Sequence, residues 1–230
     1  MSDAHKLTVI IPVFNEQQTI EQVVRAVARV DIDHEIVAVD DASTDNTIEI
    51  LSRLESEGLL RMFRQPRNQG KGAAVRVGIA EARGEICVIQ DADLEYQPSD
   101  FPELIRPILE LGADAVYGSR FMGTHRVFLY WHYAANRLLT FFTNILYDTM
   151  LTDMETGYKA VRTEILREMR LRSNTFDIEP EITAKLFKRQ RKVFEVPITY
   201  NGRTYAEGKK IGPKDAVLAV VALIRFRFSD

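Results

Sequence analysis

The chain contains a single cysteine and no long apolar run. Only Cys87 carries a thiol, so no disulfide framework can form within the chain, which suits a reducing compartment. The first residues lack the basic start and the apolar core of a signal peptide. The longest apolar run near the end, Ala216–Ile224, is far shorter than the roughly 20 residues that span a bilayer. We therefore expect a cytoplasmic chain with no membrane span.

Internal repeats and low-complexity segments are also absent. A chain of 230 residues with 46% hydrophobic and 27% charged residues is long enough to bury a core and has a globular composition. The net charge of −3 conceals an asymmetry, because residues 1–158 carry −10 and residues 159–230 carry +7. A basic C-terminal third suits a phosphorylated ligand or an anionic membrane surface, and a solvated charged surface explains the count equally well.

The first 120 residues alternate strand-like and helix-like patterns. The strand-like runs are Leu7–Ile11, Glu35–Val39, Leu60–Phe63, Glu85–Ile89 and Ala113–Tyr117. The helical patterns are Thr19–Val30, Thr44–Glu57, Gly72–Ala82 and Ser99–Leu111. This alternation predicts an α/β fold, with βαβ units, a mostly parallel sheet and helices on both faces. Ligands bind beyond the carboxyl ends of the strands in such sheets, so the residues that follow each strand are the candidates for a site.

The alternation stops after residue 120. Val127–Leu151 is rich in aromatic and aliphatic residues but is interrupted by polar ones. It predicts an amphipathic helix that lies either against a lipid interface or on the sheet, and the pattern supports the two equally. A strand-like run follows at Lys192–Pro197, and Pro213–Phe228 has a helical pattern. We expect one domain with a C-terminal elaboration.

Three carboxylates follow the fourth strand-like run. Asp91, Asp93 and Glu95 are spaced at every second residue. Successive strand residues point to opposite faces, so the first two carboxylates converge only where the strand ends and the chain turns. Mg²⁺ is held by one or two carboxylates together with substrate phosphates, so the pattern predicts a metal that binds a diphosphate. Asp-x-Asp is also a common loop sequence, so the prediction depends on the residues that accompany it.

Two other strand ends carry polar residues. Pro12 stops the first strand, and Asp40 and Asp41 end the second. A carboxylate in this position can accept hydrogen bonds from ribose hydroxyls or base N–H groups. Capping of the next helix explains Ser43 or Asp45 but not two adjacent aspartates. A phosphorylation receiver domain has its acidic pair after the first strand instead, so that alternative does not fit.

A glycine-rich turn opens the third helix. Gln69–Ala74 contains Gly70, Lys71 and Gly72, and a helix N-terminus with a lysine favours a phosphate. The spacing of a Walker A loop is missing, so the turn is not a P-loop of that class.

In this order the motifs resemble glycosyltransferases of family 2, which have the nucleotide-sugar-binding GT-A fold. Later motifs look like the polyprenyl-phosphate glycosyltransferases, the group of dolichyl-phosphate mannose synthase. These motifs are Asp91–Tyr96, Tyr117–Phe121, Leu151–Lys159, Phe176–Glu181 and Gly202–Ile211. The resemblance covers residues 7–228. It implies one GT-A domain over 1–230, with a nucleotide-sugar-binding half at 7–120 and an acceptor-binding, membrane-facing part with amphipathic helices at 121–230.

The resemblance also implies roles for individual residues. Those that line the nucleoside pocket are Pro12, Phe14, Glu16 and Asp41, the last facing the base. Those around a bridging Mg²⁺ or Mn²⁺ are Asp91, Asp93 and Glu95, although many mannose synthases have glutamine in place of Glu95. Arg120 meets the acceptor phosphate. Those on a loop that closes over both phosphates are Arg203, Lys209 and Lys210.

One position departs from the pattern. Some relatives offer Ser and Arg to the acceptor phosphate where this chain has His132 and apolar residues, so Arg126 or Arg137 is expected to substitute. A phosphomonoester has a second pKa near 6 and needs little help from a base at neutral pH. Asp153 is the reserve candidate for a base, with a structural role as the alternative.

The resemblance predicts inverting transfer of a hexose from a nucleotide-sugar to a polyprenyl or dolichyl phosphate. GDP-mannose is the favoured donor and UDP-glucose the next. A glycan hydroxyl as acceptor is one alternative, and a non-catalytic nucleotide-binding module is another. Nucleotidyltransferases have a glycine-rich, arginine-bearing loop after the first strand, which this chain lacks. We expect peripheral docking on the cytoplasmic face of a membrane or a membrane-anchored partner subunit, and no nucleic-acid partner.

Overall fold

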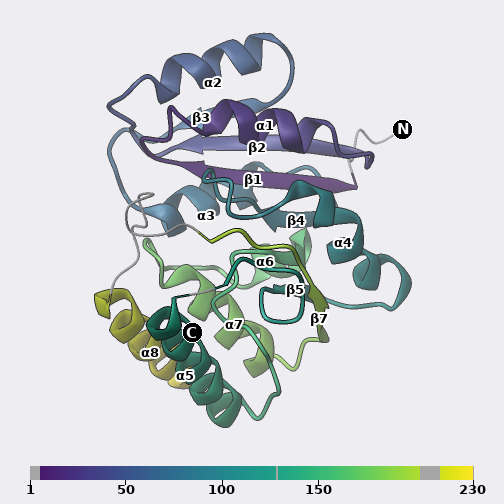
Figure 1. Ribbon diagram of the computed structural model, residues 1–230, viewed down its shortest axis with the longest axis vertical. Helices are drawn as coiled ribbons and strands as arrows, with labels where there is room; N and C mark the ends of the chain where they lie inside the picture. The colour runs from purple at the N-terminus through teal and green to yellow at the C-terminus, as the bar shows by residue number, and fades with distance from the viewer. Residues whose placement is uncertain (1–5, 128, 203–212, 230) are drawn as a thin grey trace.

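The computed structural model describes residues 6–127, 129–202 and 213–229, the first three of the last range by backbone only. A seven-stranded sheet runs through the molecule in the order β3-β2-β1-β4-β6-β5-β7 (Figure 1). The strands are β1 (Leu7–Val13), β2 (His34–Asp40), β3 (Arg61–Arg64), β4 (Ile86–Ile89), β5 (Ala115–Ser119), β6 (Lys159–Arg162) and β7 (Val193–Pro197). Only β6 runs antiparallel to its neighbours, β4 and β5. The prediction of a mostly parallel α/β sheet is confirmed.

Helices cover both faces of this sheet. The described helices are α1 (Ile20–Ala28), α2 (Thr47–Ser56), α3 (Lys71–Glu81), α4 (Phe101–Glu110), α5 (Tyr130–Tyr147), α6 (Thr163–Glu168), α7 (Ile178–Lys188) and α8 (Pro213–Phe228). Strand β1 is buried along its whole length because its side chains enter two cores. Val9 and Ile11 pack in the core that includes α1, α2 and α4, and Ile10 packs in the core that includes α3 and α5–α8. Continuous apolar runs are typical of strands buried on both faces.

The local patterns located most of these elements within two or three residues. The helix expected at Pro213–Phe228 has those bounds, and the pattern at Val127–Leu151 contains α5. The fifth strand begins two residues later than expected, at Ala115, because its hydrogen-bonded partners on β6 and β7 set its register.

Sequence patterns missed β6, α6 and α7. Strand β6 is four residues long and has charged residues at both ends, so it lacks the apolar run of a buried strand. Helix α7 begins at Ile178 and has only a narrow apolar stripe, Ile178, Ile182 and Leu186, and its first turn contains Glu179, Pro180 and Glu181. Its charges are buried instead of exposed, since Glu181 forms a 2.7 Å ion pair with Lys185 inside the core.

Helices α5 and α8 lie beside each other at one end of the molecule (Figure 1). Each buries one stripe and exposes another that is also apolar. The exposed residues on α5 include Trp131, Leu138, Phe141 and Ile145, and those on α8 include Val217, Val221, Ile224 and Phe228. Both sets follow helical spacing, so each forms a continuous stripe. No helix in the described ranges is both long and apolar enough to cross a membrane.

Candidate active site at the carboxyl ends of the strands

A cavity of about 600 Å³ lies beyond the carboxyl ends of β1, β2, β4 and β5. The topology places it there because parallel strands deliver their following loops to one edge of the sheet. Nine of the predicted site residues line it: Pro12, Phe14, Glu16, Asp41, Lys71, Asp91, Asp93, Glu95 and Arg120. The other three, Arg203, Lys209 and Lys210, lie outside the described residues. Elements far apart in sequence thus converge on one space.

Asp41 connects the end of β2 to the turn before α3. Its carboxylate accepts hydrogen bonds from the backbone N–H groups of Gln69 and Gly70 at 2.8 and 2.7 Å. The side chain of Gln65 donates a third bond at 2.9 Å. The glycine-rich turn was interpreted as a phosphate site, but its first amides bind Asp41, and the N–H of Ala73 binds the carbonyl of Asn174. The turn is therefore held by protein groups in this conformation.

Lys71 forms the centre of a charged chain on one wall of the cavity. Its Nζ lies 2.7 Å from Asp91 Oδ1 and 2.7 Å from Glu179 Oε1. Burial disfavours the charge of Lys71, but the two carboxylates outweigh burial and raise its pKa above the ordinary value. Glu179 comes from α7 and Asp91 from the end of β4, so the lysine joins the two halves of the chain across the site.

The three predicted metal ligands do not form one set. Glu95 Oε2 accepts a 2.5 Å bond from the hydroxyl of Tyr200, and Asp93 Oδ1 accepts a 3.2 Å bond from the N–H of Glu95. Among the residues that the structure describes, no three His, Cys, Asp or Glu side chains are grouped so as to hold a metal ion. Asp91 and Asp93 both line the cavity, however, and two carboxylates suffice for Mg²⁺ when phosphates complete its coordination shell. The donor set fits a metal that arrives with a diphosphate.

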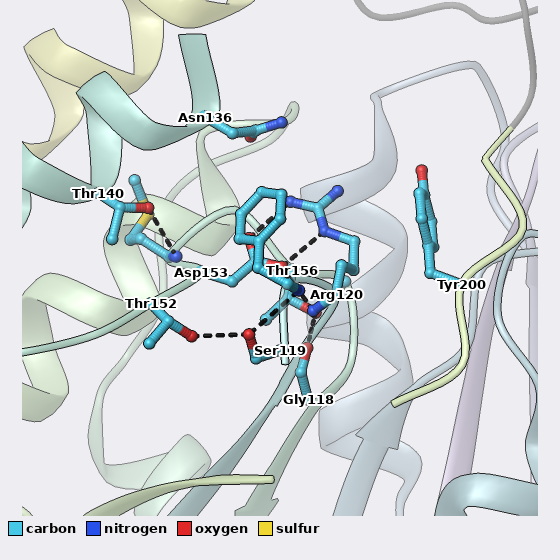
Figure 2. Close-up of polar contacts among 12 residues, drawn as sticks. Gly118, Ser119, Arg120, Asn136, Thr140, Thr152, Asp153, Thr156 and Tyr200 are labelled. Atoms are coloured by element: carbon cyan, nitrogen blue, oxygen red, sulfur yellow. Dashed lines mark hydrogen bonds and ion pairs between the residues drawn. The ribbon is translucent and has the colours of Figure 1, made fainter. Parts of the chain in front are cut away.

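Arg120 follows β5 and lines the same cavity as these carboxylates. Its guanidinium forms a two-point pair with Asp153, Nε to Oδ2 and Nη2 to Oδ1, both at 2.7 Å (Figure 2). Burial disfavours the charge of Arg120, but Asp153 outweighs burial and raises its pKa well above the ordinary value. The ring of Tyr200 lies 5.3 Å from the guanidinium carbon. These contacts fix the direction of the arginine within the cavity wall.

Asp153 does not fit the role of a base. Both of its oxygens bind Arg120, and the residue is fully buried. The carboxylate that reaches the cavity from the same segment is Glu155. Burial raises the pKa of Glu155 to about 7, against the opposing effect of Lys159.

Sequence reasoning also left Glu179 and Tyr200 without a role. Both lie in or next to motifs on which the family resemblance depends, and this position was the only indication in the sequence that they belong to the site. What the motifs do not reveal is direction: Glu179 points toward Lys71, whereas Glu181, two residues later, points into the core and binds Lys185.

The far end of the cavity is formed by α5 and α8. Its lining there includes Trp131, His132, Asn136, Leu139 and Ala216. The strand ends therefore contribute the carboxylates of the site, whereas α5 and α8 contribute apolar Trp131, Leu139 and Ala216 beside His132 and Asn136 and adjoin the exposed stripes of the two helices.

Comparisons with known proteins identify relatives of the chain. The family described as glycosyl transferase family 2 matches residues 8–170. A dolichol-phosphate mannosyltransferase from Pyrococcus furiosus is 32% identical over 213 residues, which cover 90% of this chain and 60% of the relative. A dodecaprenyl-phosphate galacturonate synthase from Rhizobium johnstonii is 28% identical over 212 residues, with 89% and 61% coverage. The chain thus spans about 60% of the length of these two relatives.

Solved structures support the fold. Glucosyl-3-phosphoglycerate synthase from Mycobacterium tuberculosis, in complex with Mn²⁺, uridine diphosphate and phosphoglyceric acid, superimposes with a TM-score of 0.75 at 21% identity. The match covers 97% of this chain and 79% of that structure. At this identity the likeness concerns the fold alone.

Proposed function

The chain belongs to glycosyl transferase family 2, and from this premise we propose that it transfers a hexose from a nucleotide-sugar to a polyprenyl phosphate. The reaction is an inverting single displacement, in which the acceptor phosphate oxygen attacks the anomeric carbon and the nucleoside diphosphate leaves. The product is a β-linked lipid-phosphate sugar from an α-linked donor.

The observation that carries this proposal is the two-ended cavity. Asp41, Asp91 and Asp93 occupy one end, where a nucleoside diphosphate and its cation would bind. Trp131 and Leu139 occupy the other end, which adjoins the exposed apolar stripes of α5 and α8. A polyprenyl phosphate has the matching structure, with a charged head and an apolar tail. An acceptor sugar that carries no lipid has no apolar part that would bind at the apolar end.

Asp91 and Asp93 would hold the cation, either Mg²⁺ or Mn²⁺. When bound, such a cation stabilises the negative charge that develops on the leaving diphosphate. Lys71 would lie next to the same phosphates, and its ion pairs with Asp91 and Glu179 hold it in place. We also propose Glu95 as a third ligand of the cation. In this structure its carboxylate accepts a hydrogen bond from the hydroxyl of Tyr200.

Arg120 would bind the acceptor phosphate. Its pair with Asp153 uses two of the five N–H donors of a guanidinium and fixes the plane of the group. A phosphate monoester is largely a dianion at neutral pH, so it attacks without a general base. We propose that Arg203, Lys209 and Lys210 add positive charge around the two anionic substrates, since bringing them together is otherwise unfavourable.

The donor is proposed from the relatives. GDP-mannose is favoured, because the chain is similar to a dolichol-phosphate mannosyltransferase. UDP-glucose is the alternative. The roles proposed for Pro12, Phe14, Glu16 and Asp41 at the nucleoside do not distinguish the two bases.

Docking on the cytoplasmic face of a membrane would deliver the acceptor. The side chains of Trp131 and Ile145 on α5 are 80% and 66% exposed, and Val221 on α8 is 54% exposed. Apolar stripes of this kind on neighbouring helices match an interfacial helix pair, whose apolar face enters the acyl boundary. A membrane-anchored partner subunit that covers the same stripes is the competing explanation.

A product assay tests the function. The full chain would be given a short polyprenyl phosphate, Mn²⁺ and either GDP-mannose or UDP-glucose, and the lipid product would be resolved by mass and anomeric configuration. We expect β-linked product from one donor. Product with retained configuration would contradict the inverting mechanism, and the absence of lipid product from both donors would contradict the proposed acceptor or donors.

A further inference from the structure

Glu155 is a cavity carboxylate to which the proposed mechanism gives no role. It lies in the segment between α5 and β6 and lines the cavity. Its Oε1 atom is buried, and the residues that the structure describes give this atom no hydrogen-bond partner. A hydrogen-bond acceptor that is buried without a partner destabilises a fold, so its position in a cavity wall indicates that a bound ligand supplies the missing donor.

The cations that interact electrostatically with Glu155 are hydrogen-bonded to other groups. Lys159 Nζ donates to the carbonyl oxygens of Met154 and Thr156, not to the adjacent carboxylate. Arg120 uses its guanidinium on Asp153. Glu155 is therefore bound by neither cation, although both attract it electrostatically.

The position of Glu155 relates it to both ends of the reaction. Two residues before it, Asp153 is paired with Arg120, the proposed acceptor-phosphate ligand. Two residues after it, Gly157 lies against Asp91 at the proposed diphosphate end, where a Cβ on the glycine would be 2.8 Å from Asp91 Oδ2. The transferred sugar must lie between the two phosphates, because it leaves one and joins the other. A group placed between the two phosphate ligands faces the sugar.

We propose that Glu155 binds a hydroxyl group of the transferred hexose and so contributes to the choice of sugar; this rests on the proposed function of the same site. A carboxylate aimed at a phosphate would repel it, whereas a sugar hydroxyl is neutral and can donate to Oε1. With two anionic substrates bound, a protonated Glu155 would also donate a hydrogen bond to a hydroxyl oxygen. No base is needed for a phosphate acceptor, so deprotonation is not the role assigned here.

Calorimetry in the presence of Mn²⁺ separates the sugar from the nucleotide. The Kd of UDP-glucose is compared with that of UDP, and the Kd of GDP-mannose with that of GDP, for the wild-type chain, Glu155→Ala and Glu155→Gln. For the donor that the wild type binds, we expect Glu155→Ala to weaken the nucleotide-sugar about ten- to a hundredfold and the nucleoside diphosphate less than about twofold. Glu155→Gln, which keeps hydrogen-bonding capacity, should lie between the two.

The outcomes distinguish this inference from the proposed function. If Glu155→Ala weakens the binding of nucleoside diphosphate and nucleotide-sugar equally, or weakens neither, the role proposed for Glu155 is wrong. Binding of the nucleotide-sugar by the wild type would still support the proposed class of donor. Binding of no nucleotide-sugar by the wild type overturns the proposed function and the assignment together. The nucleoside diphosphate titration also reports whether each variant is folded, and Glu155→Gln keeps the shape of the buried side chain if Glu155→Ala does not fold.

Discussion

Arg120 and Asp153 form a two-point ion pair with both N–O distances at 2.7 Å, and both residues are buried. The pair connects the end of β5 to the segment between α5 and β6, so it joins the two halves of the chain at the cavity wall (Figure 2). The two-point pair with Asp153 fixes the orientation of the Arg120 guanidinium before any substrate binds. Preorganised charge of this kind needs no reorganisation when an anion binds.

Replacing Asp153 should therefore damage stability as well as activity. Asp153→Ala leaves the buried guanidinium of Arg120 without its partner, and we expect the free energy of unfolding to fall by about 3–5 kcal/mol. Urea denaturation measures this change. As a control, Glu103→Gln breaks the exposed pair with Arg106 and should leave the midpoint nearly unchanged. Equal midpoints for both variants would contradict a structural role for the buried pair.

Asp93 should determine metal-dependent binding of the nucleotide. Asp93→Ala removes one of the two proposed ligands, and we expect the Mn²⁺-dependent gain in nucleoside diphosphate affinity to disappear, with transfer reduced at least about a hundredfold. Titrations with and without Mn²⁺ measure the gain. Glu49→Gln on the exposed side of α2 is the control and should retain it. If Asp93→Ala keeps the whole Mn²⁺-dependent gain in nucleoside diphosphate affinity, Asp93 is not a metal ligand.

The apolar stripes should bind vesicles. Trp131→Glu combined with Val221→Glu places a charge on each stripe, and we expect flotation with phosphatidylglycerol-containing vesicles to fall at least about tenfold. Leu111, which follows α4, is also exposed, at 60%, and α4 is distant from α5 and α8 (Figure 1). Leu111→Glu is thus the matched control and should float like the wild type. Absence of flotation for the wild type would favour a partner subunit.

Glu155 should impose a pH dependence on stability. The groups that face it are Lys159, Glu179, Arg120 and Asp153, and burial raises its pKa from 4.5 to about 7. A carboxyl with a raised pKa in the folded state stabilises fully below its unfolded pKa, and this stabilisation is lost as the pH rises through 7.

Glu155→Gln does not titrate, so it should lose less stability than the wild type between about pH 5 and about pH 8. Urea midpoints across this range measure the difference. Loss of sugar binding combined with a flatter stability profile would be expected of a functional carboxylate. Parallel profiles for the two proteins would show that Glu155 titrates normally.

Cys87 should be unreactive in the folded chain. Burial raises the pKa of its thiol to about 12, and the residue lies within β4. We expect reaction with a thiol reagent near neutral pH to be at least about a hundredfold slower than in denaturant. The colour change of Ellman's reagent measures both rates. Rapid reaction without denaturant would mean that β4 opens locally.

Many of the strands and several of the site residues could be predicted from local sequence patterns. Asp91, Asp93 and Asp41 were identified because parallel strands carry their following residues to one edge of the sheet, and the structure places all three in one cavity. The runs that became β1 and β2 were readable because strands buried on both faces are apolar throughout. Local sequence patterns were sufficient for these predictions, because hydrophobic periodicity and the end of a strand depend on residues that are close together in the chain.

The sequence by itself determined the family, the order of most elements and the edge of the sheet that holds the site. Only the tertiary structure decided which carboxylate faces the cavity: Asp153 is fully buried and paired with Arg120, whereas Glu155 lines the cavity. It also decided that β6 enters the sheet antiparallel and that Lys71 binds both Asp91 and Glu179. The physical reason is that ion pairs, burial and strand order depend on contacts between residues far apart in the chain, which no local pattern contains.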